Sequence, residues 1–89
     1  MPGKRPTQFG DLLTIPGVGK AMAQDLLSLG YRFVDDLRGA DPEDMYARLC
    51  CLQRQKLDRC VLYVFRCAVY FAETAQPEVE KLKWWNWKD

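Results

Sequence analysis

The sequence predicts an all-α protein, and three observations lead to this prediction. Apolar residues recur three and four positions apart in successive segments, which is the spacing of one face of a helix. The expected helices have start and stop residues, such as Asp41-Pro42 before one and Gly30 after another. The longest, Lys56 to about Thr74, gathers its polar residues in one narrow stripe, as a helix packed on a core does.

Size and composition limit what such a protein can do. A chain of 89 residues forms one modest core, so its function must lie on the surface or in a shallow site. Histidine, the commonest general base near neutral pH and a frequent metal ligand, is absent, which disfavours an enzyme or a catalytic zinc site. We expect no cofactor. The net charge is only +1, so binding of nucleic acid requires a local basic patch or a dedicated phosphate site.

The sequence predicts a cytoplasmic protein with no membrane partner. Its N-terminus has no apolar signal region, and the longest apolar-rich run, Cys60–Ala72, is interrupted by Arg66. The four cysteines are therefore expected to be reduced and to pack as small apolar residues: Cys50, Cys51, Cys60 and Cys67. They contain no Cys-x-x-Cys pair, which disfavours zinc, iron–sulfur and redox roles, and a contact of Cys50 with Cys60 stays open.

The chain begins with a loose arm and a short helix. Residues 1–7 have little to bury and form the arm. Apolar residues at helical spacing predict a helix over Gln8–Thr14, which ends where Ile15 meets Pro16. Its apolar positions are Phe9, Leu12 and Leu13.

A tight turn and a second helix follow. Pro16-Gly17-Val18-Gly19 is expected to reverse the chain, since glycine tolerates positive φ. The helix Lys20–Leu29 comes next, with Ala23 small enough for close approach of a neighbouring helix and Gly30 as its stop. The unit is helix, two-glycine hairpin, helix.

The middle of the chain predicts one helical turn over Val34–Leu37 and then a longer helix. Asp41 is the expected N-cap and Pro42 the first helical residue, and the helix is expected to run to about Cys51. Its core positions are expected to be Met45, Leu49 and Leu52. Residues 53–55 form a polar break.

The last helix has a polar stripe, and the tail that follows it is rich in tryptophan. The helix Lys56 to about Thr74 has a polar and aromatic stripe: Arg59, Tyr63, Arg66, Tyr70 and Glu73. We interpret its basic and aromatic members as solvent-facing in preference to a nucleic-acid surface, with Arg59 as the exception because it lies near the polar break at residues 53–55. Residues 77–89 form a tail with Trp84, Trp85 and Trp87. Docking of this tail on the domain is favoured over stacking on bases, because a small core gains from every buried ring.

The segment Phe9–Gly30 resembles the helix-hairpin-helix family of DNA-binding motifs. The match consists of Leu12-Leu13-x-Ile15-Pro16-Gly17-Val18-Gly19-Lys20 together with Ala23. The resemblance implies that the hairpin presents the start of a helix to a phosphate, with amides of Gly17, Gly19 and Ala21 in contact, charge from Lys20, and Ile15 and Val18 as anchors. The implied DNA-backbone site is Gly17, Val18, Gly19, Lys20 and Ala21. In several members of that family the hairpin carbonyls hold a monovalent cation, and the corresponding carbonyls here belong to Leu13, Ile15 and Val18.

The later part of the chain looks like a second, degenerate copy of that motif. It comprises Asp41–Cys51, a short loop and the helix from Lys56, so that residues 8–76 resemble a tandem, five-helix, SAM-like domain. The second loop has no glycine, which puts backbone phosphate binding there in doubt. Arg54, Lys56 and Arg59 could supply side-chain charge instead.

Almost the whole chain, including Asp58–Cys67 and Lys83-Trp84-Trp85-Asn86-Trp87, resembles small bacterial proteins labelled pathogenicity-locus or mitomycin-resistance proteins. The hairpin resemblance implies weak, sequence-independent binding of the DNA backbone, as an accessory to DNA repair or damage tolerance. The alternative is a protein-interaction module with a purely structural hairpin and a protein partner.

Overall fold

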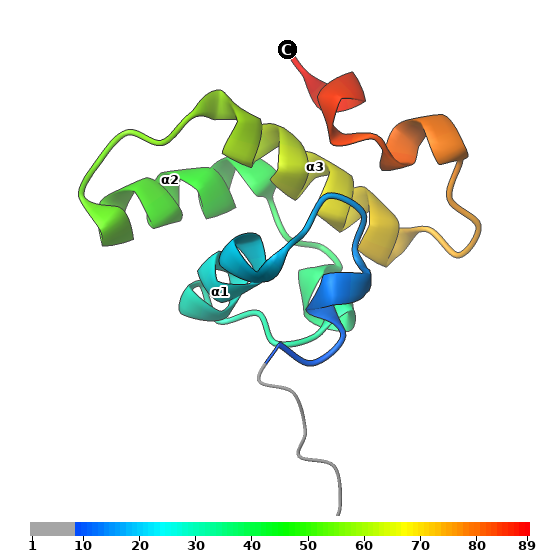
Figure 1. Cartoon of the computed structure of the whole chain (residues 1–89), viewed down its shortest axis with the longest axis horizontal. Coiled ribbons are helices and arrows are strands. Elements are labelled where there is room, and N and C mark those ends of the chain that lie inside the picture. Colours follow the sequence, from blue (N-terminus) through cyan, green and yellow to red (C-terminus); the bar gives the residue numbers. More distant parts are fainter. Residues whose placement is uncertain (1–8) are drawn as a thin grey trace, which may run out of the picture.

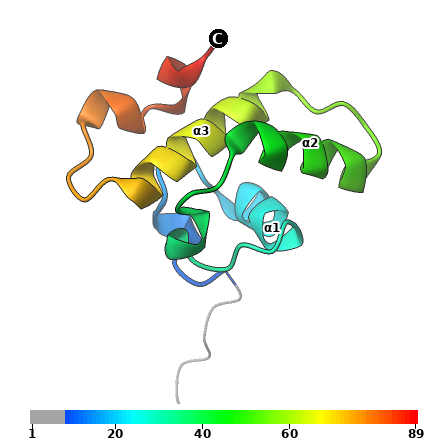
Figure 2. The same ribbon diagram turned by 180° about the vertical axis from the view of Figure 1, so that it is seen from behind.

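The computed structural model describes residues 9–89, and secondary structure in this range is entirely helical (Figures 1 and 2). The all-α prediction is therefore confirmed for this part of the chain. The expected arm, residues 1–7, lies outside the described residues. Three α-helices and four 3-10 helices follow one another as η1 (Leu12–Thr14), α1 (Lys20–Ser28), η2 (Val34–Leu37), α2 (Pro42–Gln53), α3 (Arg59–Glu73), η3 (Val79–Leu82) and η4 (Trp84–Trp87).

Helix α3 is the element around which the others pack. It contacts α2, η2, η3 and η4, and its inner face supplies six buried residues to the core: Leu62, Val64, Phe65, Cys67, Ala68 and Val69. Both ribbon views place α2 beside α3, with α1 below this pair and the C-terminal elements η3 and η4 along α3 on its other side. The prediction that the longest helix packs on the core is confirmed.

The first element is much shorter than the sequence predicts. Gln8 of the predicted helix Gln8–Thr14 lies outside the described residues, and within residues 9–14 only Leu12–Thr14 forms a 3-10 turn. Leu13 is 43% exposed, while Leu12 is fully buried. Gly10 adopts φ +55°, which no regular right-handed helix allows. The Asp11 carboxylate also accepts a hydrogen bond from the Val34 amide at 2.8 Å, so this segment is shaped by a tertiary contact and not by helical periodicity.

Helix α1 ends as predicted. Gly30 has φ +98°, and the pair of hydrogen bonds that closes the helix runs from the Gly30 amide to the Leu27 carbonyl and from the Tyr31 amide to the Leu26 carbonyl, each 2.9 Å. This is the Schellman arrangement that a C-terminal glycine permits.

Helix α2 begins at Pro42, as predicted, because the Asp41 carboxylate accepts a hydrogen bond from the Glu43 amide at 3.0 Å. It continues through Gln53, two residues past the expected end at Cys51. The expected core position Leu52 is wrong, since this side chain is 58% exposed. Tyr46 is buried in its place, and its hydroxyl donates to the Leu57 carbonyl, so the buried face of α2 is turned toward the start of the next helix.

Helix α3 begins three residues later than predicted, at Arg59. The signal that sequence reasoning missed is Asp58, whose carboxylate accepts a hydrogen bond from the Cys60 amide at 2.9 Å and so acts as the N-cap. Lys56 therefore belongs to the loop. In that loop Arg54 takes the left-handed conformation, with φ +55°, in which a helix end more often uses glycine.

Candidate nucleic-acid interface

The hairpin between η1 and α1 is a tight turn anchored in the core. The Val18 amide donates to the Ile15 carbonyl at 3.0 Å, and Gly17 has φ +83°, which is the geometry of a type II turn with Pro16 at its second position. Ile15 and Val18 are only 2% and 7% exposed. Their expected role as anchors of the hairpin is confirmed, and the turn itself uses the Val18 amide.

The start of α1 presents backbone amides that the helix does not use. The Ala23 amide donates to the Gly19 carbonyl at 2.9 Å, so the amides of Lys20, Ala21 and Met22 precede the first such bond. Gly19 is the N-cap and offers no side chain to accept from them. The positive end of the helix dipole thus faces outward beside the exposed Lys20 side chain, which makes no ion pair within residues 9–89.

The two hairpin glycines have different surroundings. A Cβ added to Gly19 would meet nothing within 4 Å, so nothing in the described fold requires the absence of a side chain there. A Cβ added to Gly17 would lie 3.0 Å from Cδ1 of Trp84. Gly19 is therefore open to an approaching group, whereas Gly17 borders on the C-terminal segment.

The basic residues expected around the second loop do not form one group. Arg54 and Lys56 are exposed and make no ion pair within the described part of the chain. Arg59 instead forms an ion pair and hydrogen bond with Asp89. Arg54 and Lys56 are therefore available for a ligand, while Arg59 is engaged by the C-terminal segment.

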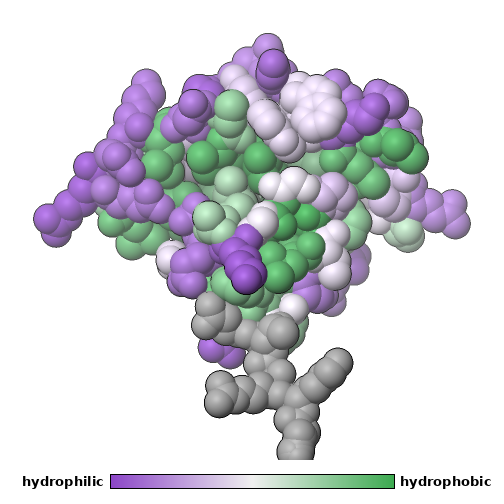
Figure 3. All heavy atoms as spheres, viewed as in Figure 1, coloured by the Kyte–Doolittle hydropathy of each residue, from purple (hydrophilic) through white to green (hydrophobic). Residues whose placement is uncertain are grey.

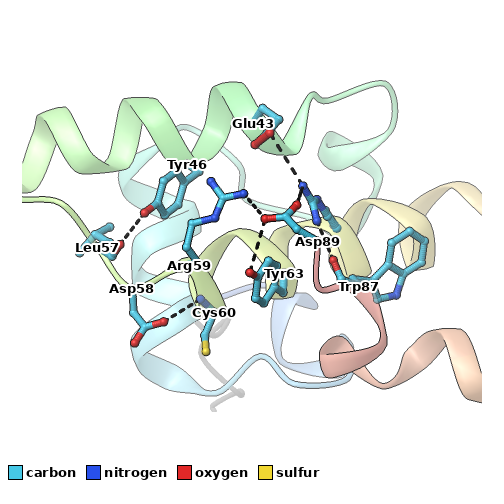
Figure 4. A network of polar contacts seen from close by, with 10 residues as sticks. Glu43, Tyr46, Leu57, Asp58, Arg59, Cys60, Tyr63, Trp87 and Asp89 are labelled. Atoms are coloured by element: carbon cyan, nitrogen blue, oxygen red, sulfur yellow. Dashed lines mark hydrogen bonds and ion pairs between the residues drawn. The ribbon is translucent and has the colours of Figure 1, made fainter.

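The C-terminal segment covers much of the polar stripe of α3. The interpretation of this stripe as solvent-facing is wrong for Tyr63, Arg66 and Tyr70, which are partly buried, whereas Arg59 and Glu73 are exposed. Figure 4 shows the Asp89 carboxylate between Arg59 and Tyr63. Arg66 donates to this carboxylate at 2.7 Å and to the Trp87 carbonyl at 2.6 Å, and its side chain is only 22% exposed. Farther along the helix the stripe is also occupied, because the ring of Tyr70 lies 5.4 Å from that of Trp87 and the Gly39 amide donates to Glu73.

Electrostatics follow this geometry. Hydrogen bonds from Arg59 and then from Arg66 hold the pKa of Asp89 below its usual range. The same contact with Asp89 raises the pKa of Arg59. Sequence reasoning missed the role of Asp89. Two signals could have indicated it: Asp89 is an acidic residue that follows a tryptophan-rich segment, and the predicted long helix carries two arginines seven positions apart.

The four cysteines are free thiols, as predicted, but they are not all buried. Cys67 is buried, Cys50 and Cys60 are half-buried, and Cys51 is exposed. A hydrogen bond with Asp58 raises the pKa of Cys60, and burial raises that of Cys67, so both resist forming a thiolate. Within the described range, no three or more cysteine, aspartate or glutamate residues gather as a metal site.

The surface also contains apolar features. On the face seen in Figure 3, hydrophobic side chains occupy much of the middle of the molecule and hydrophilic side chains most of its edges. An open hollow of about 510 Å³ lies between the end of α1 and α2, lined by Ser28, Leu29, Ala47, Arg48, Cys51 and Leu52. Among the residues that the structure describes, no helix is long and apolar enough to cross a membrane.

Comparison with known proteins agrees with the resemblance found in the sequence. Residues 5–89 match the model of the Cdd1 family, described as pathogenicity locus. The chain is 33% identical over 79 residues to the mitomycin resistance protein McrB of Streptomyces lavendulae, a match that covers 86% of this chain and 70% of that protein. No solved structure matches. With a family model that spans nearly its full length, the chain belongs to the Cdd1 pathogenicity locus family.

Proposed function

We propose that the protein binds the DNA backbone without sequence preference, through the start of α1, and that it is a tandem helix-hairpin-helix domain. The observation that carries the proposal is the combination of three free amides at Lys20, Ala21 and Met22 with the open N-cap at Gly19. Amides at a helix start, together with the helix dipole, are suited to a phosphate oxygen.

Gly19 argues against a purely structural hairpin. Serine, threonine, aspartate and asparagine stabilise a helix start better than glycine does, because their side chains accept from the first amides. Here the backbone of Gly19 is extended, with φ −97° and ψ −170°, and there is room for a side chain. Glycine at this position leaves the amides available and lets a phosphate approach the backbone closely, which is what the DNA-binding function needs.

The charge of the protein limits the strength of this binding. A net charge of +1 neutralises few phosphates, so affinity is expected to be weak and to fall as salt rises. The exposed Arg54 and Lys56 can add contacts at the second loop by side-chain charge. Contacts of this kind carry no base information, so binding is independent of sequence.

An accessory role in DNA repair or damage tolerance, in the cytoplasm and without catalysis, fits this binding mode. The Streptomyces lavendulae relative is named for mitomycin resistance, and we extend a role in resistance to this chain as part of the proposal. Carbonyls of Leu13, Ile15 and Val18 are the proposed positions for a bridging monovalent cation. The Ile15 carbonyl already accepts from Val18 and keeps one lone pair for such an ion.

The test is an amide NMR titration with a short random-sequence DNA duplex at low salt, repeated at higher salt. We expect the amides of Gly19, Lys20, Ala21 and Met22 to shift together and to return as salt is added. Gly19→Val should lower affinity about tenfold or more without unfolding the protein, because valine fits the extended backbone but blocks a phosphate.

Gln24→Val is the matched control, since it adds the same side chain to an exposed position on α1. Equal affinity of wild type and Gly19→Val, with both proteins folded, would show that the hairpin is structural.

A protein-interaction module is the second candidate, and the hollow between α1 and α2 favours it. Leu52 borders this hollow and is 58% exposed, so the hollow and its rim together offer apolar surface to a partner. Leu52→Ser should then weaken capture of a protein partner and leave DNA affinity unchanged.

A further inference from the structure

The C-terminal residues 84–89 connect the hairpin to the polar stripe of α3. At one end of this segment the indole of Trp84 lies against Gly17 of the hairpin. At the other end the carboxylate of Asp89 lies on Arg59 and Arg66 (Figure 4). One short segment thus borders the candidate phosphate site and occupies two cationic side chains.

The groups around Asp89 form a clamp for an oxyanion. Two guanidinium groups and the hydroxyl of Tyr63 surround one carboxylate, with contacts of 2.7 Å from Arg66 and 3.5 Å from Tyr63. Guanidinium groups bind carboxylate and phosphate oxygens with the same donor geometry. A clamp that holds Asp89 is therefore also suited to a phosphodiester.

We propose that Arg59, Tyr63 and Arg66 form a second phosphate-binding site for nucleic acid, and that Asp89 occupies this site as an internal competitor. The inference rests on the proposed DNA-binding function and extends it to a face of α3 beyond the hairpin. Release of residues 84–89 frees Arg59 and Arg66 and at the same time removes the indole beside Gly17. DNA binding and docking of the segment thus exclude each other at this face.

The way the segment is held makes such release feasible. Neither η3 nor η4 contributes a fully buried residue, in contrast to the inner face of α3. The Arg59 and Asp89 side chains are 46% and 49% exposed, and ion pairs between exposed groups contribute little to stability. Trp84 packs against the core, so displacing the segment uncovers part of this surface, but the fully buried large side chains of the described chain all lie outside it.

One acidic side chain stays at the site after release. Glu43 of α2 lies 3.8 Å from Arg66, so Arg66 remains partly neutralised. Arg59 has no other carboxylate partner among the ion pairs of the described chain, and it stands next to the second loop that carries Arg54 and Lys56. Arg59 is therefore expected to contribute more to phosphate binding than Arg66.

The experiment compares the full-length chain with Asp89→Asn, using fluorescence anisotropy of a labelled random-sequence DNA duplex at several salt concentrations. Asp89→Asn should bind several-fold more tightly. In a plot of log affinity against log salt concentration, the slope should become more negative by about one to two, because each newly contacted phosphate contributes about −0.9 to this slope.

Asp35→Asn is the matched control. It removes the same charge from an exposed ion pair, Asp35–Arg38 at 3.8 Å, and also frees an arginine, but one away from the clamp. It should change affinity by less than about twofold. Adding Arg59→Gln to Asp89→Asn should return both affinity and slope most of the way to wild-type values, with the remaining difference due to Arg66.

Release of the segment has its own readout in the indole proton of Trp87, which donates to the Lys81 carbonyl at 2.8 Å. If this signal moves in Asp89→Asn while DNA affinity stays at the wild-type value, the second site is overturned and the hairpin function stands. If Asp89→Asn binds more tightly and Gly19→Val has no effect in either background, the second site stands and the hairpin function fails. If no chain binds DNA, both proposals fail.

Discussion

Trp84 packs against Gly17, so that a Cβ at Gly17 would lie 3.0 Å from the indole Cδ1. Two separate requirements therefore make position 17 a glycine. The turn needs φ +83°, which side chains other than glycine rarely adopt, and the indole leaves little room. The hairpin that resembles a DNA-binding motif is thereby in contact with the opposite end of the described chain.

A double-mutant cycle tests this contact. Gly17→Ala should destabilise the protein by about 1–2 kcal/mol from backbone strain, with an additional cost from the indole. In a Trp84→Ala background the additional cost disappears, so the two changes should be less than additive by at least about 0.5 kcal/mol. Urea unfolding of the four proteins measures this coupling, and strict additivity would mean that the side chains do not meet in solution.

The buried face of α2 can be checked with two identical truncations. Leu49→Ala should cost about 2–5 kcal/mol, because Leu49 is fully buried and its loss leaves a cavity. Leu52→Ala, one turn of sequence away and 58% exposed, should change the free energy of unfolding by no more than about 0.5 kcal/mol. A comparable loss of stability for both changes would mean that Leu52 is buried in the core, as the sequence pattern predicts.

Docking of the C-terminal segment should depend on pH through Asp89. Its pKa is lowered by Arg59 and then by Arg66 in the folded protein. A carboxyl group with a lowered pKa stabilises the docked state above its unfolded value of about 3.9, and this contribution is lost as pH falls through the lowered pKa. The Trp87 indole signal, followed between neutral pH and about pH 2, should report release in the acidic range while the core remains folded.

Asp89→Asn supplies the comparison for that titration. Its indole signal should lack the transition, because asparagine does not ionise in this range. An identical transition in both proteins would assign it to another carboxyl group.

The thiols should react in the order of their exposure. Cys51 is exposed on α2 and should react first with an uncharged thiol reagent at neutral pH. Cys67 is buried and its pKa is raised by burial, so it should react only when the protein unfolds. Mass spectrometry of the modified cysteines over time gives this order, and rapid modification of Cys67 in the folded protein would contradict its placement in the core.

The sequence by itself determined the local features of this protein. The stop of α1 at Gly30 and the start of α2 at Asp41-Pro42 each depend on residues within one or two turns of each other. Backbone preferences and capping act over this range, so a pattern of neighbouring residues is enough to predict them. Asp58 is also a residue type that favours an N-cap. Lys56 and Leu57 are compatible with a helix as well, so the pattern alone places the start of α3 too early.

Only the tertiary structure decided which surfaces remain free. Helical spacing alone cannot tell that Leu13 and Leu52 face outward, since either flank of an apolar stripe fits the same periodicity. Nor can it place Asp89 on Arg59 and Arg66, or Trp84 against Gly17. These contacts join residues far apart in the chain. The contact of Asp89 forms because α3 brings two guanidinium groups to one face, where a carboxylate from the C-terminal segment neutralises them.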